Sequence, residues 1–379
     1  MRSFIASALL SVLAATAHAA PSNTTQATAS DSSCREVTIP VTVSVPRFII
    51  NTTIANDWDA VTLALNLTQR DVNTTADPLP ISGKTSGPVN STYQIGATVC
   101  GSGGPTLVLT HGIIESKLYW RPNFPGSLKY SFVDAAVAQG YSVLSYDRIG
   151  VASSAGTVDP LTDAQFQVET AVLSALTQYA RNSMGATQVA LIGHSYGSYI
   201  SAAAASDVEA SGAIDAVVLT GFSGTVQYFA PFVAGAALRV ARTQNATRWG
   251  NLASSYLMSA DRFALAYVYF AGDFNRTVAD WTFEVEAEPF ALGELPSLLD
   301  TPVAFDQVTA PVLVLQGRHD VSACGGDCVG LLNATAALFT SSKGVQTVDD
   351  LPAGHDLNLH EVAPQAFQMV FDFLKAQGV

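Results

Sequence analysis

One stretch, residues 188–198 with the sequence QVALIGHSYGS, constrains the fold more than any other part of the chain. Its first half, Val189 to Ile192, is short, apolar and partly β-branched, which is typical of a strand buried on both faces. Gly193 and Gly197 flank Ser195, and the small residues that follow favour a helix lying close to the strand. The stretch therefore predicts a strand, a sharp turn that exposes the Ser195 hydroxyl, and a helix.

Strands and helices alternate on both sides of this turn. Buried strands are predicted at 106–110, 141–146, 188–193, 215–220, 311–316 and 345–350, with helices at 127–138, 162–183, 196–206 and 361–376. Two earlier strands are predicted at 36–45 and 92–99, and Pro40 breaks the first or puts it at a sheet edge. This order predicts an α/β fold, a mostly parallel doubly wound sheet covered by helices on both faces.

The chain is expected to have four parts. Residues 1–19, with Arg2, an apolar run and an Ala-His-Ala end, predict a secretory signal peptide, and residues 20–33 predict a disordered leader. Residues 34–222 and 310–379 are expected to form the α/β core. Residues 223–309 interrupt the alternation and are rich in alanine and aromatic residues. They are expected to form a helical cap over the sheet edge at which Ser195 lies. We call residues 223–309 the insertion segment.

Charge and hydropathy narrow the partners. With 18 Lys+Arg against 31 Asp+Glu the net charge is −13, which disfavours nucleic acid and acidic membranes. After residue 19 no apolar run is long enough to span a bilayer, so we expect a secreted, extracellular protein that is not an integral membrane protein. A small-molecule substrate is expected, and the sequence leaves the oligomeric state open.

The four cysteines predict two disulfides, Cys34–Cys100 and Cys324–Cys328, as suits an exported chain. A metal site is the alternative, but the spacing of Cys34 and Cys100 does not suit a zinc site, so we expect no metal and no cofactor. The Asn-x-Ser/Thr sequons that we expect to be glycosylated are Asn51, Asn66, Asn73, Asn90, Asn245, Asn275 and Asn333.

Three polar residues, Ser195, Asp320 and His355, each follow the carboxyl end of a predicted strand. Open α/β sheets gather their functional residues at this edge. A serine hydroxyl is a poor nucleophile until a histidine accepts its proton, and that histidine needs a carboxylate to orient it and stabilise its charged form. The order therefore predicts Ser195 as nucleophile, Asp320 as acid and His355 as base.

Alternatives to two of these roles are present in the sequence. His360 could be the base, although it lies beside the last predicted helix. Asp327, Asp349 or Asp350 could supply the carboxylate.

The chain resembles the α/β-hydrolase family from about residue 106 to residue 379. The matching motifs are HG at 111–112, DRIG at 147–150, GHSYG at 193–197, GRHD at 317–320 and GH at 354–355. The resemblance implies the roles given above for Ser195, Asp320 and His355. It also implies that the backbone N–H groups of Ile113 and Tyr196 form an oxyanion hole.

Departures from the family pattern narrow the chemistry. The lipase motif HGGG is HGII here, so the chain resembles the capped branch with a single His-Gly pair, which includes esterases, lactonases, lyases and acyl-transfer enzymes. Ala152 replaces a second glycine of the DRxGxG motif, and Ser195 in place of aspartate argues against epoxide hydrolases and dehalogenases.

The resemblance therefore implies a carboxylic-ester hydrolase that cleaves an ester or lactone through an acyl-enzyme. The many aromatic and few basic residues of the insertion segment predict a neutral, apolar or aromatic substrate. A lyase, acyltransferase or cyclase with the same three residues, or a noncatalytic binding domain, are the alternatives.

Overall fold

The structure is a computed structural model that describes residues 34–68, 79–207 and 211–379, all within one compact unit. The predicted signal peptide, the predicted leader and the sequon at Asn73 lie outside the described residues. Of the other predicted glycosylation sites, Asn66 is half-buried and the rest have exposed asparagines. No helix among the described residues combines the length and the apolar character that crossing a bilayer requires.

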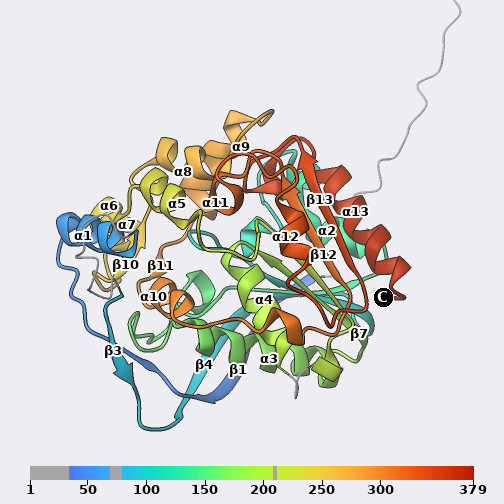
Figure 1. The fold of residues 1–379 in the computed structure, drawn as a ribbon, viewed down its shortest axis with the longest axis horizontal. Coiled ribbons are helices and arrows are strands. Elements are labelled where there is room, and N and C mark those ends of the chain that lie inside the picture. Colours follow the sequence, from blue (N-terminus) through green and yellow to red (C-terminus); the bar gives the residue numbers. More distant parts are fainter. Residues whose placement is uncertain (1–33, 69–78, 208–210) are drawn as a thin grey trace, which may run out of the picture. The chain divides into compact units, whose positions relative to one another are not determined.

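An eight-stranded sheet forms the centre of this unit (Figure 1). Its strands, in spatial order, are β1 (Cys34–Val45), β4 (Val89–Cys100), β6 (Ser142–Tyr146), β5 (Gly104–Thr110), β7 (Ala186–His194), β8 (Ala216–Thr220), β12 (Val312–Gly317) and β13 (Val345–Leu351). The pairs β1–β4 and β4–β6 are antiparallel, and all the other pairs are parallel. The prediction of a mostly parallel α/β sheet is confirmed.

Helices cover the sheet and complete its core. Helices α3 (Phe166–Asn182) and α4 (Tyr196–Ser206) pack together on one face, and α2 (Phe132–Ala138) and α13 (Ala363–Ala376) lie on the other (Figure 1). Strands β6, β8 and β12 are buried along their whole length, as expected of strands covered on both sides.

The helix predicted at 127–138 is interrupted. A 3₁₀ turn (Ser127–Tyr130) is followed by Ser131, whose backbone is extended. The Ser131 side chain caps α2 by accepting the N–H of Asp134. The helix predicted at 162–183 begins later, at Phe166.

Both predicted cysteine pairs are disulfide-bonded. Cys34 lies opposite Cys100 in the β1–β4 pair, and their sulfurs are 2.06 Å apart. Pro40 lies in β1, which is an edge strand, the position in a sheet where a residue without an N–H is tolerated. The Cys324–Cys328 bond, with its sulfurs 2.15 Å apart, closes the loop after α11 (Val321–Cys324), directly beyond Asp320.

The region between β1 and β4 forms a small sheet and a helix. Strands β2 (Phe48–Ile50) and β3 (Ile81–Lys84) pair as a small antiparallel sheet, and α1 (Asp57–Leu67) begins with a capping box at Asn56.

The insertion segment is mixed rather than wholly helical. Its helices are α5 (Phe229–Ala236), α6 (Ala241–Gln244), α7 (Ala246–Trp249), α8 (Arg262–Tyr269), α9 (Arg276–Trp281), which runs into a π-helical turn (Thr282–Glu286), and α10 (Glu294–Leu299). Between them β9 (Arg239–Val240), β10 (Tyr256–Met258) and β11 (Phe290–Ala291) form a small antiparallel sheet, which the prediction missed. Strands of two or three residues are too short to show the alternation by which strands are predicted.

Candidate active site

Ser195 lies in the turn between β7 and α4. Its backbone has φ 53° and ψ −121°, a left-handed conformation that is strained for a residue with a side chain. The N–H of Ser195 donates to the carbonyl of Thr220 at the end of β8, a 2.8 Å bond that holds the turn against the neighbouring strand. The structure thus contains the sharp turn that the sequence predicts.

The two glycines around Ser195 are required by close backbone packing. A Cβ atom on Gly193 would overlap the backbone of Gly197 and Ser198, and a Cβ on Gly197 would overlap the carbonyl of Thr110. Because strand, turn and helix pass within contact distance, a larger residue at either position would displace Ser195.

His355 and Asp320 are bonded to each other. His355 Nδ1 lies 2.7 Å from Asp320 Oδ2, and both side chains are fully buried. The other oxygen, Asp320 Oδ1, accepts the backbone N–H groups of Ser322 and Ala323, each at 2.8 Å. His355 Nε2 is buried and has no hydrogen-bond partner among the described residues, so it is available to a group in the neighbouring pocket.

The charges of this pair support each other. Burial opposes a charged imidazole, but the attraction of Asp320 and the hydrogen bond to it outweigh burial and raise the pKa of His355 above its ordinary 6.5. Burial likewise opposes the Asp320 carboxylate, yet His355 and the N–H of Ala323 lower the pKa of Asp320 below 3.8. The pair is therefore arranged to stabilise an imidazolium beside a carboxylate.

The alternative residues lie in other surroundings. His360 is held by the backbone: Nδ1 lies 2.8 Å from the carbonyl of Asp356, and Nε2 accepts the N–H groups of Gly354 and Ala271. Burial lowers the pKa of His360 to about 4. Among the candidate acids, the exposed Asp327 lies 3.7 Å from Arg318, and Asp349 accepts the N–H of Gly330.

A pocket opens beside Ser195 and His355. Its wall includes Ile113 and Tyr196, the two residues whose N–H groups were predicted as oxyanion donors. Tyr196 is the first residue of α4, so its N–H has no acceptor within the helix. The other lining residues are Tyr199, Gly221, Thr225, Val226, Phe229, Phe232, Leu295, Leu298, Ser322 and Ala323.

Arg148, from the DRIG motif, joins several parts of this region. Its guanidinium is buried and donates to Glu169 on α3 and Glu294 on α10, each at 2.7 Å, and to the carbonyl of Gly112 at 3.0 Å. It also lies over the ring of Tyr196, 4.7 Å from the centroid. The motif was noted in the sequence, but nothing there indicated these partners.

The sequence and the fold both resemble those of known proteins. Residues 107–367 match a family described as the alpha/beta hydrolase family. Among curated proteins, none matches the sequence.

Several solved structures have a similar fold. One titled as a putative non-heme bromoperoxidase, BpoC, from Mycobacterium tuberculosis is 17% identical, with a TM-score of 0.51, covering 75% of this chain and 96% of its own. One titled as a lipase in its open form is 14% identical, with a TM-score of 0.52, covering 75% of this chain and 95% of its own. At these identities the likeness concerns the fold, and together with the family match it shows that the chain belongs to the α/β-hydrolase family.

Proposed function

We propose that this protein is a secreted serine hydrolase that cleaves neutral, apolar or aromatic carboxylic esters or lactones through an acyl-enzyme. The observation that carries the proposal is the pocket, which brings Ser195, His355, Ile113 and Tyr196 to one cavity otherwise walled mainly by apolar side chains. Apolar walls with a few convergent polar groups are typical of small-molecule sites.

In the proposed mechanism, the Ser195 hydroxyl attacks the ester carbonyl while His355 Nε2 takes its proton. Asp320 holds Nδ1 and stabilises the imidazolium. The N–H groups of Ile113 and Tyr196 donate to the oxyanion of the tetrahedral intermediate. His355 then protonates the leaving alcohol, and a water molecule, activated by the same histidine, releases the acid.

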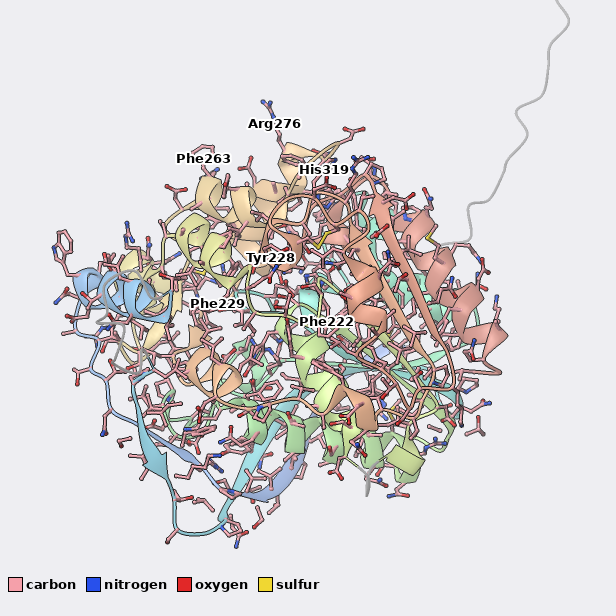
Figure 2. The ribbon with its side chains drawn as sticks, viewed as in Figure 1. Phe222, Tyr228, Phe229, Phe263, Arg276 and His319 are labelled. Carbon is pink, nitrogen blue, oxygen red and sulfur yellow. A yellow bond between two sulfur atoms is a disulfide. The ribbon has the colours of Figure 1, made fainter. Side chains whose placement is uncertain are left out.

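The charges around the pocket favour an uncharged substrate. The pocket wall contains no lysine, arginine, aspartate or glutamate among the described residues. Arginines of the insertion segment have partners elsewhere: Arg248 pairs with Glu288, and Arg262 with Asp280 and Glu284. Figure 2 shows Arg276 pointing outward, away from the core. An anionic substrate would therefore find no lysine or arginine in the pocket wall to pair with its charge.

Ester chain length should consequently control the rate. We expect kcat/KM to rise about fourfold for each methylene added to a short acyl chain, since each buried CH₂ contributes about 0.8 kcal/mol, until the pocket is filled. Hydrolysis of a series from acetate to octanoate esters measures this.

Phe229→Ala should flatten the chain-length series, because Phe229 lines the pocket. Phe263 is 77% exposed on the outer side of α8, so Phe263→Ala is the control (Figure 2). A preference for anionic or phosphorylated esters would contradict the proposal.

Two experiments separate the candidate functions. A fluorophosphonate should label Ser195, whereas a noncatalytic binding domain would stay unlabelled. Product analysis in water then distinguishes hydrolysis from the lyase, acyltransferase and cyclase alternatives, because only hydrolysis yields the free acid and alcohol.

The pH profile should report His355. The base must be neutral to accept a proton, and its pKa is raised above 6.5, so activity needs a more alkaline pH than an unperturbed histidine would require. We expect kcat/KM to fall on acidification with a midpoint above 6.5. A midpoint well below 6.5 in steady-state assays of the wild-type enzyme would argue against the Asp320–His355 pair.

Export is part of the proposal. The two disulfides suit an oxidising compartment, and the sequence of residues 1–19 is typical of a signal peptide.

A further inference from the structure

A group of buried acceptors lies next to His355. It consists of Glu115, His194, Asp356 and Glu286, which are at most 1% exposed, and we call it the buried acid cluster. The ring of His194 lies 4.8 Å from that of His355, centroid to centroid. His194 Nε2 faces two carboxylates, with Glu115 Oε1 at 3.2 Å and Asp356 Oδ1 at 3.6 Å.

Glu115 also holds the loop that carries Ile113. Its Oε2 accepts the N–H of Gly112 at 2.6 Å, directly before Ile113. On the other side of Ile113, the N–H of Ser116 donates to Glu286 Oε1 at 2.8 Å, and the Tyr269 hydroxyl donates to the Ile113 carbonyl. These bonds fix the backbone on both sides of the Ile113 N–H.

Hydrogen bonding sets the tautomer of His194. The Thr220 hydroxyl donates its single proton to the carbonyl of Gly193, at 3.1 Å. In this arrangement the hydroxyl accepts from His194 Nδ1, which lies 2.9 Å away, and we therefore assign the ring proton to Nδ1 and the lone pair to Nε2. An ionised Glu115 would face this lone pair with another lone pair.

No donor in the described part of the chain satisfies Glu115 Oε1, His194 Nε2 or either Asp356 oxygen. Buried acceptors without donors are costly, and the cost is largest when they carry negative charge. One proton on Glu115 turns the contact of Oε1 with Nε2 from acceptor–acceptor into donor–acceptor.

We propose that Glu115 is a positioning residue that acts as a neutral carboxylic acid: Oε2 accepts from Gly112, and the proton on Oε1 lies toward His194 Nε2. It thereby ties the loop of the oxyanion donor Ile113 to the strand end that precedes Ser195. The inference rests on the proposed hydrolase function, because the loop matters only if Ile113 stabilises an oxyanion.

Electrostatics agree with the geometry. Burial raises the pKa of Glu115 to about 8, so the acid form dominates at neutral pH. Burial also raises the pKa values of Asp356 and Glu286 and lowers that of His194. The titratable and charged groups around Glu115 are Tyr119, Arg148, His194, Tyr269, Glu286, His355 and Asp356.

Two substitutions test the role in catalysis. Glu115→Gln keeps an acceptor for Gly112 and supplies an N–H donor to His194, as the neutral acid does, whereas Glu115→Leu supplies neither. We expect Glu115→Leu to lower kcat about 10²-fold with little change in KM, because the oxyanion donor is misplaced. Glu115→Gln should restore most of that loss. If both variants are equally impaired, Glu115 does not act as a neutral acid.

A second measurement does not depend on catalysis. A group whose pKa is about 8 in the folded state and 4.5 unfolded contributes stability fully below about pH 4.5, and that stability is lost as the pH rises through about 8. The unfolding temperature of Glu115→Gln should therefore fall less between pH 5 and pH 9 than that of the wild type. Glu288→Gln, which removes an ion-paired carboxylate outside the cluster, should keep the wild-type dependence.

The outcomes distinguish this inference from the proposed function. An unchanged pH dependence in Glu115→Gln would overturn the neutral acid even if fluorophosphonate labels Ser195. Failed labelling would overturn the function and with it the positioning role, but not the neutral state of Glu115. The ligand atoms of Glu115, His194 and Asp356 lie within 4.8 Å of one another, a spacing that also suits a metal ion. Stoichiometric metal in the purified wild type that Glu115→Gln lacks would likewise overturn the neutral acid.

Discussion

Ester hydrolysis by Ser195→Ala is expected to fall by ~10⁴-fold or more, and the same result is expected for His355→Ala. Ser195 is the proposed nucleophile that forms the acyl-enzyme, and His355 is the proposed base. Each substitution therefore removes a group that the proposed mechanism requires. Ser195→Ala should leave the fold intact, whereas His355→Ala removes the partner of the buried Asp320 carboxylate and should also cost some stability, so activity is compared on protein shown to be folded. Steady-state kinetics and circular dichroism on the purified variants measure the two effects.

His360→Ala is the matched control for the base. Both nitrogens of His360 contact backbone groups, so this substitution should cost stability but keep substantial turnover. If His360→Ala is inactive and His355→Ala is active, His360 and not His355 is the base. Near-normal activity of folded Ser195→Ala would refute serine catalysis.

The sequence predicted the sheet well where the local pattern was strong. Strands β7 and β12 are short apolar runs between turn residues, and such runs indicate buried strands without help from the rest of the chain. Prediction was poorer where an element is short or where a single capping residue divides a helical pattern. Ser131 interrupts a helical pattern by capping α2, and β9 to β11 are too short to have a period of their own.

The same distinction holds for the candidate site. Ser195, Asp320 and His355 follow strand ends, so the fold rules that predict the sheet also predict that they converge. The structure places His355 against Asp320 and puts Ser195 in the same pocket. The order of these residues along the chain was sufficient for that expectation.

The buried acid cluster could not be found in this way. Ser116 and its partner Glu286 are 170 residues apart, and neither Glu115 nor Glu286 lies in a recognisable motif. A single glutamate in a loop is usually exposed, whereas contacts between distant parts of the chain bury these two, with Glu115 against Gly112 and His194 and Glu286 against Ser116. Glu294 was likewise unpredictable as a partner of Arg148.

Arg148 shows what such a buried charge does for the architecture. It follows β6, pairs with α3 through Glu169 and with the insertion segment through Glu294, and holds Gly112 beside the proposed oxyanion donor. One cation faces two carboxylates, and burial raises the pKa of Glu169 to about 8, so one proton can be shared between the two acids. Arg148 thus joins the core, the insertion segment and the HG loop, in addition to the bonds of Ser116 with Glu286 and of Tyr269 with Ile113.

Arg148→Met should therefore lower the free energy of unfolding by about 3–5 kcal/mol, because it leaves two buried carboxyls without their cation. Arg262 also bridges two carboxylates, Asp280 and Glu284, but it is 43% exposed, so Arg262→Met should cost less than about 1 kcal/mol. Urea unfolding at constant pH measures both. Adding Glu169→Gln and Glu294→Gln to Arg148→Met should recover part of the lost stability, because the cost lies in the unpaired acids. If Arg148→Met is as stable as Arg262→Met, the ion pairs of Arg148 do not hold the core and the insertion segment together.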